Sequence, residues 1–427
     1  MKIIFFFIKY NNKHMQVYLV GGAVRDQILG VPISDYDWVV VGATINDLLY
    51  LGFKSVGKDF PVFLHPITGD EYALARIERK ISIGHNGFKY NVSSDVNIND
   101  DLYRRDITIN AIARTLDGNI IDPCNGQYDI KHYTIRHISK SFIEDPLRIF
   151  RVARFSAKLF NKKFIIANET KKLMSTIVYN GEITALSVER IWDETKKALY
   201  TSSPEYYFYV LYDCGALSVI FPEIHKLFKN AIVFNKSYLM NNVNKYYSFL
   251  ILKKGCLLSN NIDIRFAALC CEFNNLLNTS TFWLYSHECV TFVIDIIEKF
   301  CNRLHVPKKL KELVILSIRF SHELYCINKF VPSNLIDVLD RLNIWRNFNI
   351  IDKLITIFMV IVDDTINDRL LNYVKNNFFL ESLKIIKNIS AKHLLNNLDN
   401  PMAIKNELKK LRINKLTKLL CENKILF

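Results

Sequence analysis

The stretch from Val17 to Val41, VYLVGGAVRDQILGVPISDYDWVVV, constrains the fold of this chain more than any other segment. The apolar, β-prone run at each end of the stretch predicts a strand. Gly21 and Gly22 follow the first run and let the backbone come close to a ligand. A short helix is expected from about Ala23 to Leu29, and its free amide groups could meet a phosphate. The sequence therefore predicts a strand–turn–helix–loop–strand unit with an anion site at its turn.

Three charged residues of this stretch indicate its chemistry. Arg25 lies in the first turn of the expected helix, where it can add a charge-assisted contact to a phosphate. Asp35 and Asp37 are two residues apart at a strand start, so we expect their side chains on the same face. Paired carboxylates suit Mg²⁺, and two such ions can activate a hydroxyl and stabilise a leaving pyrophosphate. The combination indicates nucleotidyl transfer; the structural alternative is a glycine turn with two solvated aspartates.

Asp100–Ala113, DDLYRRDITINAIA, is a second polar motif. We expect Arg105, Asp106 and Asn110 on one short helix, where Asp106 and Asn110 are neighbours because they are four residues apart. A salt-bridged helix start would explain the same pattern.

Glu144–Phe155, EDPLRIFRVARF, is a third motif. Asp145 precedes a proline and is expected to cap a helix. Arg148, Arg151 and Arg154 recur every third residue, which spreads them over about a third of the helix circumference. Three arginines on one flank indicate a binding surface for anions, although a solvated helix face has the same pattern.

Length, charge and cysteine usage set broad limits. The 427 residues are too many for one core, so two to four domains are expected. The net charge of +14 favours a polyanionic partner such as a nucleic acid. Nine cysteines without metal-like spacing predict no disulfide framework and a cytoplasmic protein. The opening IIFFFI is too short to be a signal or to span a membrane, and no membrane partner is expected.

These motifs together resemble those of the bacterial class II CCA-adding enzymes, or tRNA nucleotidyltransferases, in the long form of γ-proteobacteria. The similarity continues almost unbroken to about Glu194. It implies an α+β fold, with a polymerase-β-like nucleotidyltransferase head of mixed sheet and helices followed by an all-α neck, body and tail.

The resemblance implies roles for the head residues. Asp35 and Asp37 would hold Mg²⁺ and carry the catalysis, and Glu71 is the best match for the acidic residue that completes the carboxylate set. Arg105 would hold the triphosphate, and Asp106 would accept a hydrogen bond from the ribose 2′-hydroxyl.

It also implies roles for the arginine helix. Asp145 and Arg148 would read the base by hydrogen bonding, and Arg151 and Arg154 would orient the nucleotide and bind its phosphates. Gly21, Gly22 and Arg25 would seat the triphosphate of ATP or CTP. A further helix over Thr184–Leu199, capped by Ser187 and with Arg190 exposed, is assigned to structure.

The expected domains are an N-terminal extension or misassigned start at residues 1–14, a head at 15–137, a helical neck at 138–225, and a helical body and tail at 226–427 that bind tRNA. In the resembled family the body carries an HD phosphohydrolase motif. Here Cys271 and Glu272 stand where the His-Asp dipeptide belongs, and no histidine of the chain precedes an aspartate. We therefore expect a degenerate HD region without that activity.

The predicted function is addition and repair of the 3′-terminal CCA of tRNA from CTP and ATP, by a monomer or homodimer. A poly(A) polymerase with the same head motifs is one alternative. A partial enzyme that adds only CC or only A is another. A non-catalytic RNA-binding remnant is the third, although the intact acidic pair argues against it.

Overall fold

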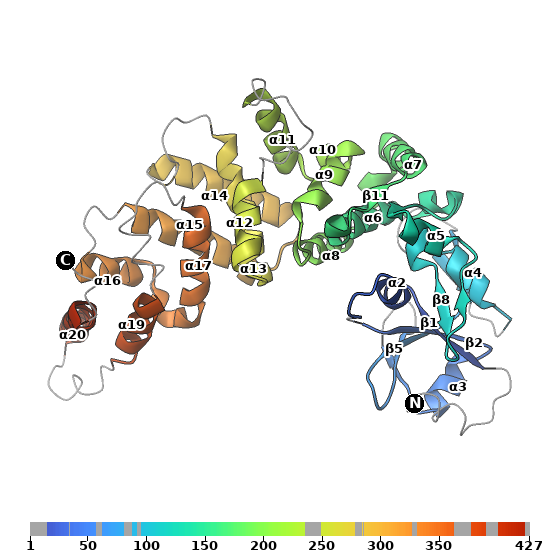
Figure 1. Ribbon diagram of the computed structural model, residues 1–427. Coiled ribbons are helices and arrows are strands. Elements are labelled where there is room, and N and C mark those ends of the chain that lie inside the picture. The colour runs from blue at the N-terminus through green and yellow to red at the C-terminus, as the bar shows by residue number, and fades with distance from the viewer. Residues whose placement is uncertain are drawn as a thin grey trace. The chain divides into compact units, whose positions relative to one another are not determined.

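The computed structural model describes residues 15–33, 35–56, 62–80, 88–91, 95–234, 249–277, 284, 286–326, 331–362, 377–389 and 400–422. The chain divides into two compact units, Met1–Phe221 and Pro222–Phe427 (Figure 1). The mixed-sheet head and the mostly helical remainder confirm the predicted fold class. The predicted domain limits stay predictions, and the predicted extension 1–14 lies outside the described residues.

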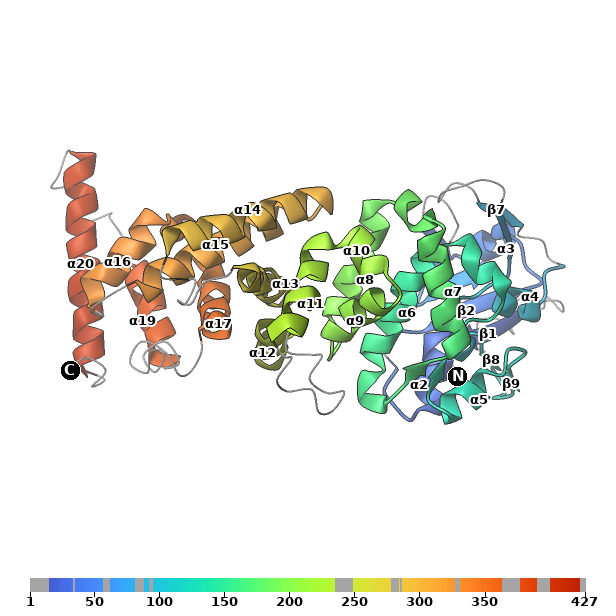
Figure 2. The ribbon, with the colours of Figure 1, turned by 90° about the horizontal axis from the view of Figure 1, so that it is seen from above.

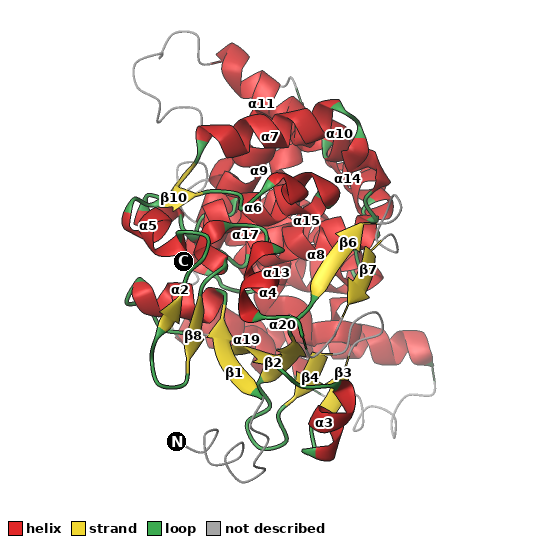
Figure 3. Cartoon of the chain, turned by 90° about the vertical axis from the view of Figure 1, so that its right-hand side faces the viewer, coloured by secondary structure: helices red, strands yellow, loops and turns green. Residues whose placement is uncertain are grey.

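A seven-stranded mixed sheet, ordered β3-β4-β5-β2-β1-β8-β9, dominates the head (Figure 3). Its strands are β1 (Gln16–Val20), β2 (Asp37–Val41), β3 (Lys54–Val56), β4 (Val62–Leu64), β5 (Glu71–Leu74), β8 (Ala113–Thr115) and β9 (Ile120–Ile121). Only the β2–β5 pair in this sheet is parallel. Two smaller sheets pair β6 (Ile77–Lys80) with β7 (Phe88–Asn91), and β10 (Thr134–Ile135) with β11 (Ile165–Ile166).

The central strands β1 and β2 bury side chains on both faces of the sheet, and the residues that point to one face form a common cluster. Tyr18 and Val20 of β1 share a buried cluster with Val39 of β2 and Ala113 of β8. Leu102, from the helix after the β6–β7 hairpin, packs into the same cluster. The polar residues Asp37 and Glu71 stand at the ends of β2 and β5, outside this packed core.

The first unit also contains nine described helices, which are α2 (Gly22–Ile28), α3 (Ile45–Tyr50), α4 (Ile98–Tyr103), α5 (Gly126–Lys131), α6 (Leu147–Lys158), α7 (Asn168–Tyr179), α8 (Val188–Leu199), α9 (Glu205–Asp213) and α10 (Ala216–Ile220). The arginine helix is α6, which packs against α8 and α9 (Figure 2). Its apolar face carries fully buried Ile149, Phe150, Val152 and Ala153. Burial of this face fixes the side from which the arginines project.

Two local predictions were wrong in detail. β2 begins at Asp37, so Asp35 precedes the strand instead of lying in it. Arg105 and Asp106 do not lie on one helix with Asn110. Helix α4 ends at Tyr103, because Ile107 takes an extended conformation and forms a bridge to His137, and a separate 3₁₀ turn then spans Thr108–Asn110.

The second unit is helical throughout its described part. Its α-helices are α11 (Pro222–Phe234), α12 (Leu250–Leu258), α13 (Ile262–Cys271), α14 (His287–Arg303), α15 (Lys308–Tyr325), α16 (Pro332–Arg341), α17 (Ile351–Ile361), α19 (Asn377–Lys387) and α20 (Pro401–Glu422). Helix α13 packs against α12, α15 and α17, and α20 packs against α16 and α19. None of the helices in the described residues is both long and apolar enough to cross a membrane.

Candidate active site

A cavity of about 1000 Å³ in the first unit collects the polar side chains that the motifs supply. All twelve residues predicted to form the site line this cavity, which are Gly21, Gly22, Arg25, Asp35, Asp37, Glu71, Arg105, Asp106, Asp145, Arg148, Arg151 and Arg154. They come from the ends of strands β2 and β5, helix α2 and the turn before it, the loop before β2, the loop after α4, and helix α6 with the residue pair before it. Segments more than a hundred residues apart in sequence thus meet at one site.

The carboxylates of the cavity are adjacent through strand register. Asp37 of β2 lies opposite Glu71 in the parallel β2–β5 pair, so both side chains leave the sheet on the same side. The walls of the cavity shield Asp37 from water and raise its pKa, Arg105 opposes this rise, and the carboxylates of Glu71 and Asp35 add to it. Such clustered negative charge favours a cation.

The donor set fits a hard divalent cation. Within the part of the chain that the structure describes, no three His, Cys, Asp or Glu side chains converge into a closed metal cage. Asp35 and Asp37 both line the cavity wall, where their carboxylate oxygens could serve as ligands. Mg²⁺ is commonly bound by one or two carboxylates together with substrate phosphates, so two carboxylates at the cavity wall suit it.

The turn after β1 requires glycine for two reasons. Gly21 has a φ of +69°, a region that L side chains rarely adopt. A Cβ atom at this position would also lie 2.9 Å from Nη1 of Arg105. The turn therefore brings backbone and guanidinium group together with no side chain between them.

Arg25 is the most enclosed cation of the site, with 1% of its surface exposed. Its Nε and Nη2 atoms donate to Oδ1 of Asp26 at 2.8 and 2.7 Å, and its Nη1 donates to Oδ1 of Asn110 at 2.5 Å. Lys158 reaches the other oxygen of Asp26 at 3.2 Å. These contacts link α2, the 3₁₀ turn and α6 at the wall of the cavity.

Arg105 is held in place by Asp101, which is completely buried on α4. The Nε and Nη2 atoms of Arg105 donate to Oδ2 of Asp101 at 3.3 and 3.1 Å, while Arg104 donates to Oδ1 of the same carboxylate. Burial alone would raise the pKa of Asp101, but the two guanidinium groups hold it below its ordinary value. Asp101 is thus ionised and fixes Arg105 at the cavity wall.

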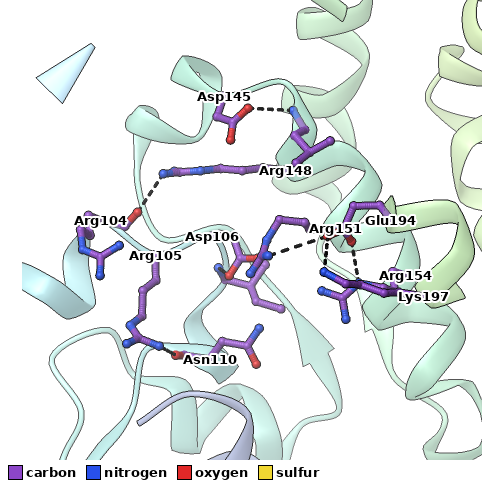
Figure 4. A network of polar contacts seen from close by, with 12 residues as sticks. Arg104, Arg105, Asp106, Asn110, Asp145, Arg148, Arg151, Arg154, Glu194 and Lys197 are labelled. Atoms are coloured by element: carbon purple, nitrogen blue, oxygen red, sulfur yellow. Dashed lines mark hydrogen bonds and ion pairs between the residues drawn. The ribbon is translucent and has the colours of Figure 1, made fainter. Parts of the chain in front are cut away.

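Asp106 forms the central ion pair of the network (Figure 4). Its Oδ2 accepts a hydrogen bond from Nε of Arg151 at 2.7 Å, and its Oδ1 accepts one from the amide of Ile107 at 3.0 Å. Burial would raise the pKa of Asp106, but Arg151 outweighs burial and lowers it to about 2. The carboxylate is therefore a permanent hydrogen-bond acceptor at neutral pH.

Asp145 and Arg148 lie close together at the start of α6 (Figure 4). Oδ1 of Asp145 accepts from the amide of Leu147 at 3.2 Å, although Pro146 and not Asp145 stands at the N-cap position of α6. Arg148 is buried, and its Nη2 and Nη1 atoms donate to the carbonyl oxygens of Arg104 at 2.8 Å and Ser141 at 3.3 Å. The two carbonyl contacts fix the orientation of Arg148, whereas the backbone holds only one oxygen of Asp145.

Helix α8 supplies two residues that sequence reasoning missed. Arg190 is not exposed as predicted, since its Nη2 atom donates to Oδ2 of Asp145 at 2.9 Å. Glu194 is buried and accepts from Nε of Arg154 at 2.6 Å. Ser187 stands at the predicted N-cap position of α8, but its side chain makes no capping hydrogen bond. A spacing of four residues between Arg190 and Glu194 was the available signal, since it places them on one helix face.

Two family models match parts of this chain. The family described as "Poly A polymerase head domain" matches residues 17–136, and "Probable RNA and SrmB- binding site of polymerase A" matches residues 163–228.

Solved structures share the fold. The CCA-adding enzyme of Bacillus stearothermophilus in complex with CTP has a TM-score of 0.62 at 20% identity, over 99% of this chain and 96% of that one. A CCA-adding enzyme in complex with ATP has a TM-score of 0.57 at 21% identity, over 96% of this chain and 87% of that one.

A curated relative is closer in sequence. The CCA-adding enzyme of Buchnera aphidicola subsp. Acyrthosiphon pisum (strain Tuc7) is 42% identical over 413 residues, which cover 94% of this chain and 97% of the relative. Identity at this level over nearly the whole of both chains shows that the protein belongs to the CCA-adding enzyme family.

Proposed function

We propose that this protein adds and repairs the 3′-terminal CCA of tRNA, using CTP and ATP and releasing pyrophosphate. The observation that carries the proposal is the single cavity that unites the glycine turn, the carboxylate set and the arginine helix. Family membership supports the same reaction.

In the proposed reaction, the 3′-hydroxyl of the tRNA attacks the α-phosphate of the bound nucleotide. Asp35 and Asp37, with Glu71 beside them, would hold the divalent ions, for which we propose Mg²⁺. When bound, such ions stabilise the charge of the attacking hydroxyl and of the leaving pyrophosphate. Gly21 and Arg105 would seat the triphosphate at the turn, where backbone and guanidinium group are already close together.

Sugar and base would each be recognised by a carboxylate. Asp106 would accept a hydrogen bond from the ribose 2′-hydroxyl and so select ribonucleotides, and its low pKa keeps it ionised for this role. Asp145 would accept from the exocyclic amino group of cytosine or adenine, while Arg148 donates to the ring acceptors of either base. Uracil and guanine would present an oxygen to Asp145, and two facing acceptors without a proton are costly.

The second unit is proposed to bind tRNA as the body and tail, without phosphohydrolase activity. Cys271 and Glu272, which replace the expected His-Asp dipeptide, are both fully buried. Glu272 accepts from the amide of Leu252 at 2.9 Å and from Nδ2 of Asn275 at 2.9 Å. A carboxyl group that accepts from the first turn of α12 in this way is occupied by the fold, so we propose no metal-binding role for it.

The test is extension of a tRNA that ends at its discriminator base, with CTP, ATP, UTP and GTP offered singly and together. The proposal predicts CC from CTP alone and CCA from CTP with ATP. Because one matching family is described by a poly(A) polymerase head, that enzyme is the second candidate. It predicts long adenylate tails and little use of CTP. No extension of any RNA would instead indicate a non-catalytic remnant.

The proposal also covers the compartment and the oligomeric state of the enzyme. A tRNA substrate and nine free cysteines fit a cytoplasmic enzyme. It is proposed to act as a monomer or homodimer, which light scattering in the presence and absence of tRNA would resolve.

A further inference from the structure

The ring of Phe155, on α6, lies close to three of the arginine side chains that line the cavity. Its ring centroid lies 4.2 Å from the guanidinium carbon of Arg154, 5.5 Å from that of Arg25 and 5.8 Å from that of Arg151. Arg25 comes from α2, whereas the other two arginines lie on α6 with the ring. The phenyl group is 6% exposed and lines the cavity, so it is the shared neighbour of three phosphate-binding candidates.

Each of these guanidinium groups also has a carboxylate partner. The pairs are Arg25–Asp26 at 2.7 Å, Arg151–Asp106 at 2.7 Å and Arg154–Glu194 at 2.6 Å. A triphosphate must compete with these carboxylates, because both kinds of anion bind the N–H donors of arginine.

An aromatic ring does not compete in this way. The N–H donors of arginine lie in the plane of the guanidinium group, so a cation that packs over a ring keeps its donors for another partner. The ring attracts each cation by its negative face and holds the group in place whichever anion it binds. An aliphatic side chain of similar volume would fill the space without that attraction.

We propose that Phe155 is a positioning residue for nucleotide binding, which holds the guanidinium groups of Arg25, Arg151 and Arg154 toward the triphosphate through cation–π contacts. The inference deepens the proposed function and rests on it. Packing alone is the competing explanation, since α6 also carries buried aromatic and aliphatic residues. Phe150 is the matched control, because it lies on the same helix and its ring packs against Tyr207.

The test replaces Phe155 by phenylalanine analogues with one, two and three fluorine atoms. Fluorine withdraws charge from the ring face and changes its volume little, so cation–π attraction falls stepwise while packing is kept. Calorimetry would measure the dissociation constants of ATP and CTP, and steady-state assays on tRNA would measure KM and kcat. We expect the dissociation constants and KM to rise stepwise to about tenfold, which corresponds to about 1.4 kcal/mol. We expect kcat to change by less than about threefold, because the ring does not touch the reacting atoms.

The same analogues at Phe150 should leave nucleotide affinity unchanged. Phe155→Leu should weaken nucleotide binding at least as much as the trifluorinated ring, with a circular dichroism spectrum like that of the parent. A flat series at Phe155 would overturn the proposal and leave packing as the role of the ring. Because calorimetry needs no turnover, this result is distinct from failure of the proposed function, which would appear as no tRNA extension by the parent enzyme.

Discussion

Replacement of Arg190 by glutamine should impair the choice of nucleotide more than the rate of correct addition. Asp145 accepts two hydrogen bonds from Arg190, at 2.9 and 3.4 Å, and one from the Leu147 amide at 3.2 Å. Arg190→Gln removes the charged partner of both oxygens and leaves only the bond from the Leu147 amide to Oδ1, so the carboxylate is held less firmly toward the base. The variant therefore tests whether a fixed orientation of Asp145 determines specificity.

The size of the effect follows from the environment of the ion pair. Hydrogen bonds to charged groups contribute about 1.5–3 kcal/mol. Exposed fractions of 24% for the Arg190 side chain and 17% for Asp145 call for a discount for solvent screening. We therefore expect the variant to lose about 1.4 kcal/mol of discrimination between CTP and UTP. This is about a tenfold fall in the ratio of kcat/KM for CTP to kcat/KM for UTP.

Single-turnover addition to tRNA ending at the discriminator base would measure this ratio for the parent enzyme, Arg190→Gln and a control. Lys196→Gln is the matched control, because Lys196 lies on the same helix and pairs with exposed Asp193. An equal fall in kcat/KM for both nucleotides, or no change in their ratio in a stably folded variant, would refute the reasoning.

Three other variants test the remaining parts of the site and the second unit. Asp35→Ala should abolish nucleotide transfer while tRNA affinity in a filter-binding assay stays within about threefold, because the carboxylate serves the reacting phosphate and not the tRNA body; surviving incorporation would contradict its role. Gly21→Ala should lower the free energy of unfolding by about 1–3 kcal/mol in denaturant titration and raise the KM for ATP and CTP, since φ is +69° and Arg105 is close; an unaffected KM would argue against a phosphate-binding turn. Burial raises the pKa of Glu272 to about 8, whereas the pKa of an unfolded glutamate is about 4.3. The stability that the protonated side chain contributes is therefore fully present below about pH 4.3, falls as pH rises, and is lost above about pH 8. Glu272→Gln should flatten this decline in unfolding free energy between about pH 5 and pH 8, and an unchanged slope would show that the parent carboxyl is not protonated in the fold.

Local sequence patterns were sufficient to predict the elements that carry the site. β1 and α2 lie within one residue of the predicted limits, and α6 begins two residues after Asp145, because apolar runs and arginine spacing are properties of short segments. The register of the parallel β2–β5 pair places Asp37 opposite Glu71, and this register could not be predicted from local patterns. Glu71 was assigned to the site only through family resemblance.

Contacts between distant segments could not be predicted in the same way. Arg190 meets Asp145 across 45 residues, and the packing of α8 on α6 decides that contact. The helix expected to hold Arg105, Asp106 and Asn110 is interrupted because Ile107 pairs with His137, thirty residues later. Tertiary pairing there outweighs local helix preference, and it turns Asp106 toward Arg151.

Extension of tRNA by the purified protein tests the central claim most directly. A tRNA ending at its discriminator base would be incubated with CTP, with ATP and with both, in Mg²⁺, and the products would be sequenced. The account predicts CC from CTP alone, CCA from both nucleotides, and no transfer by Asp35→Ala. Tails of adenylate without cytidylate, or the same products from Asp35→Ala, would contradict it.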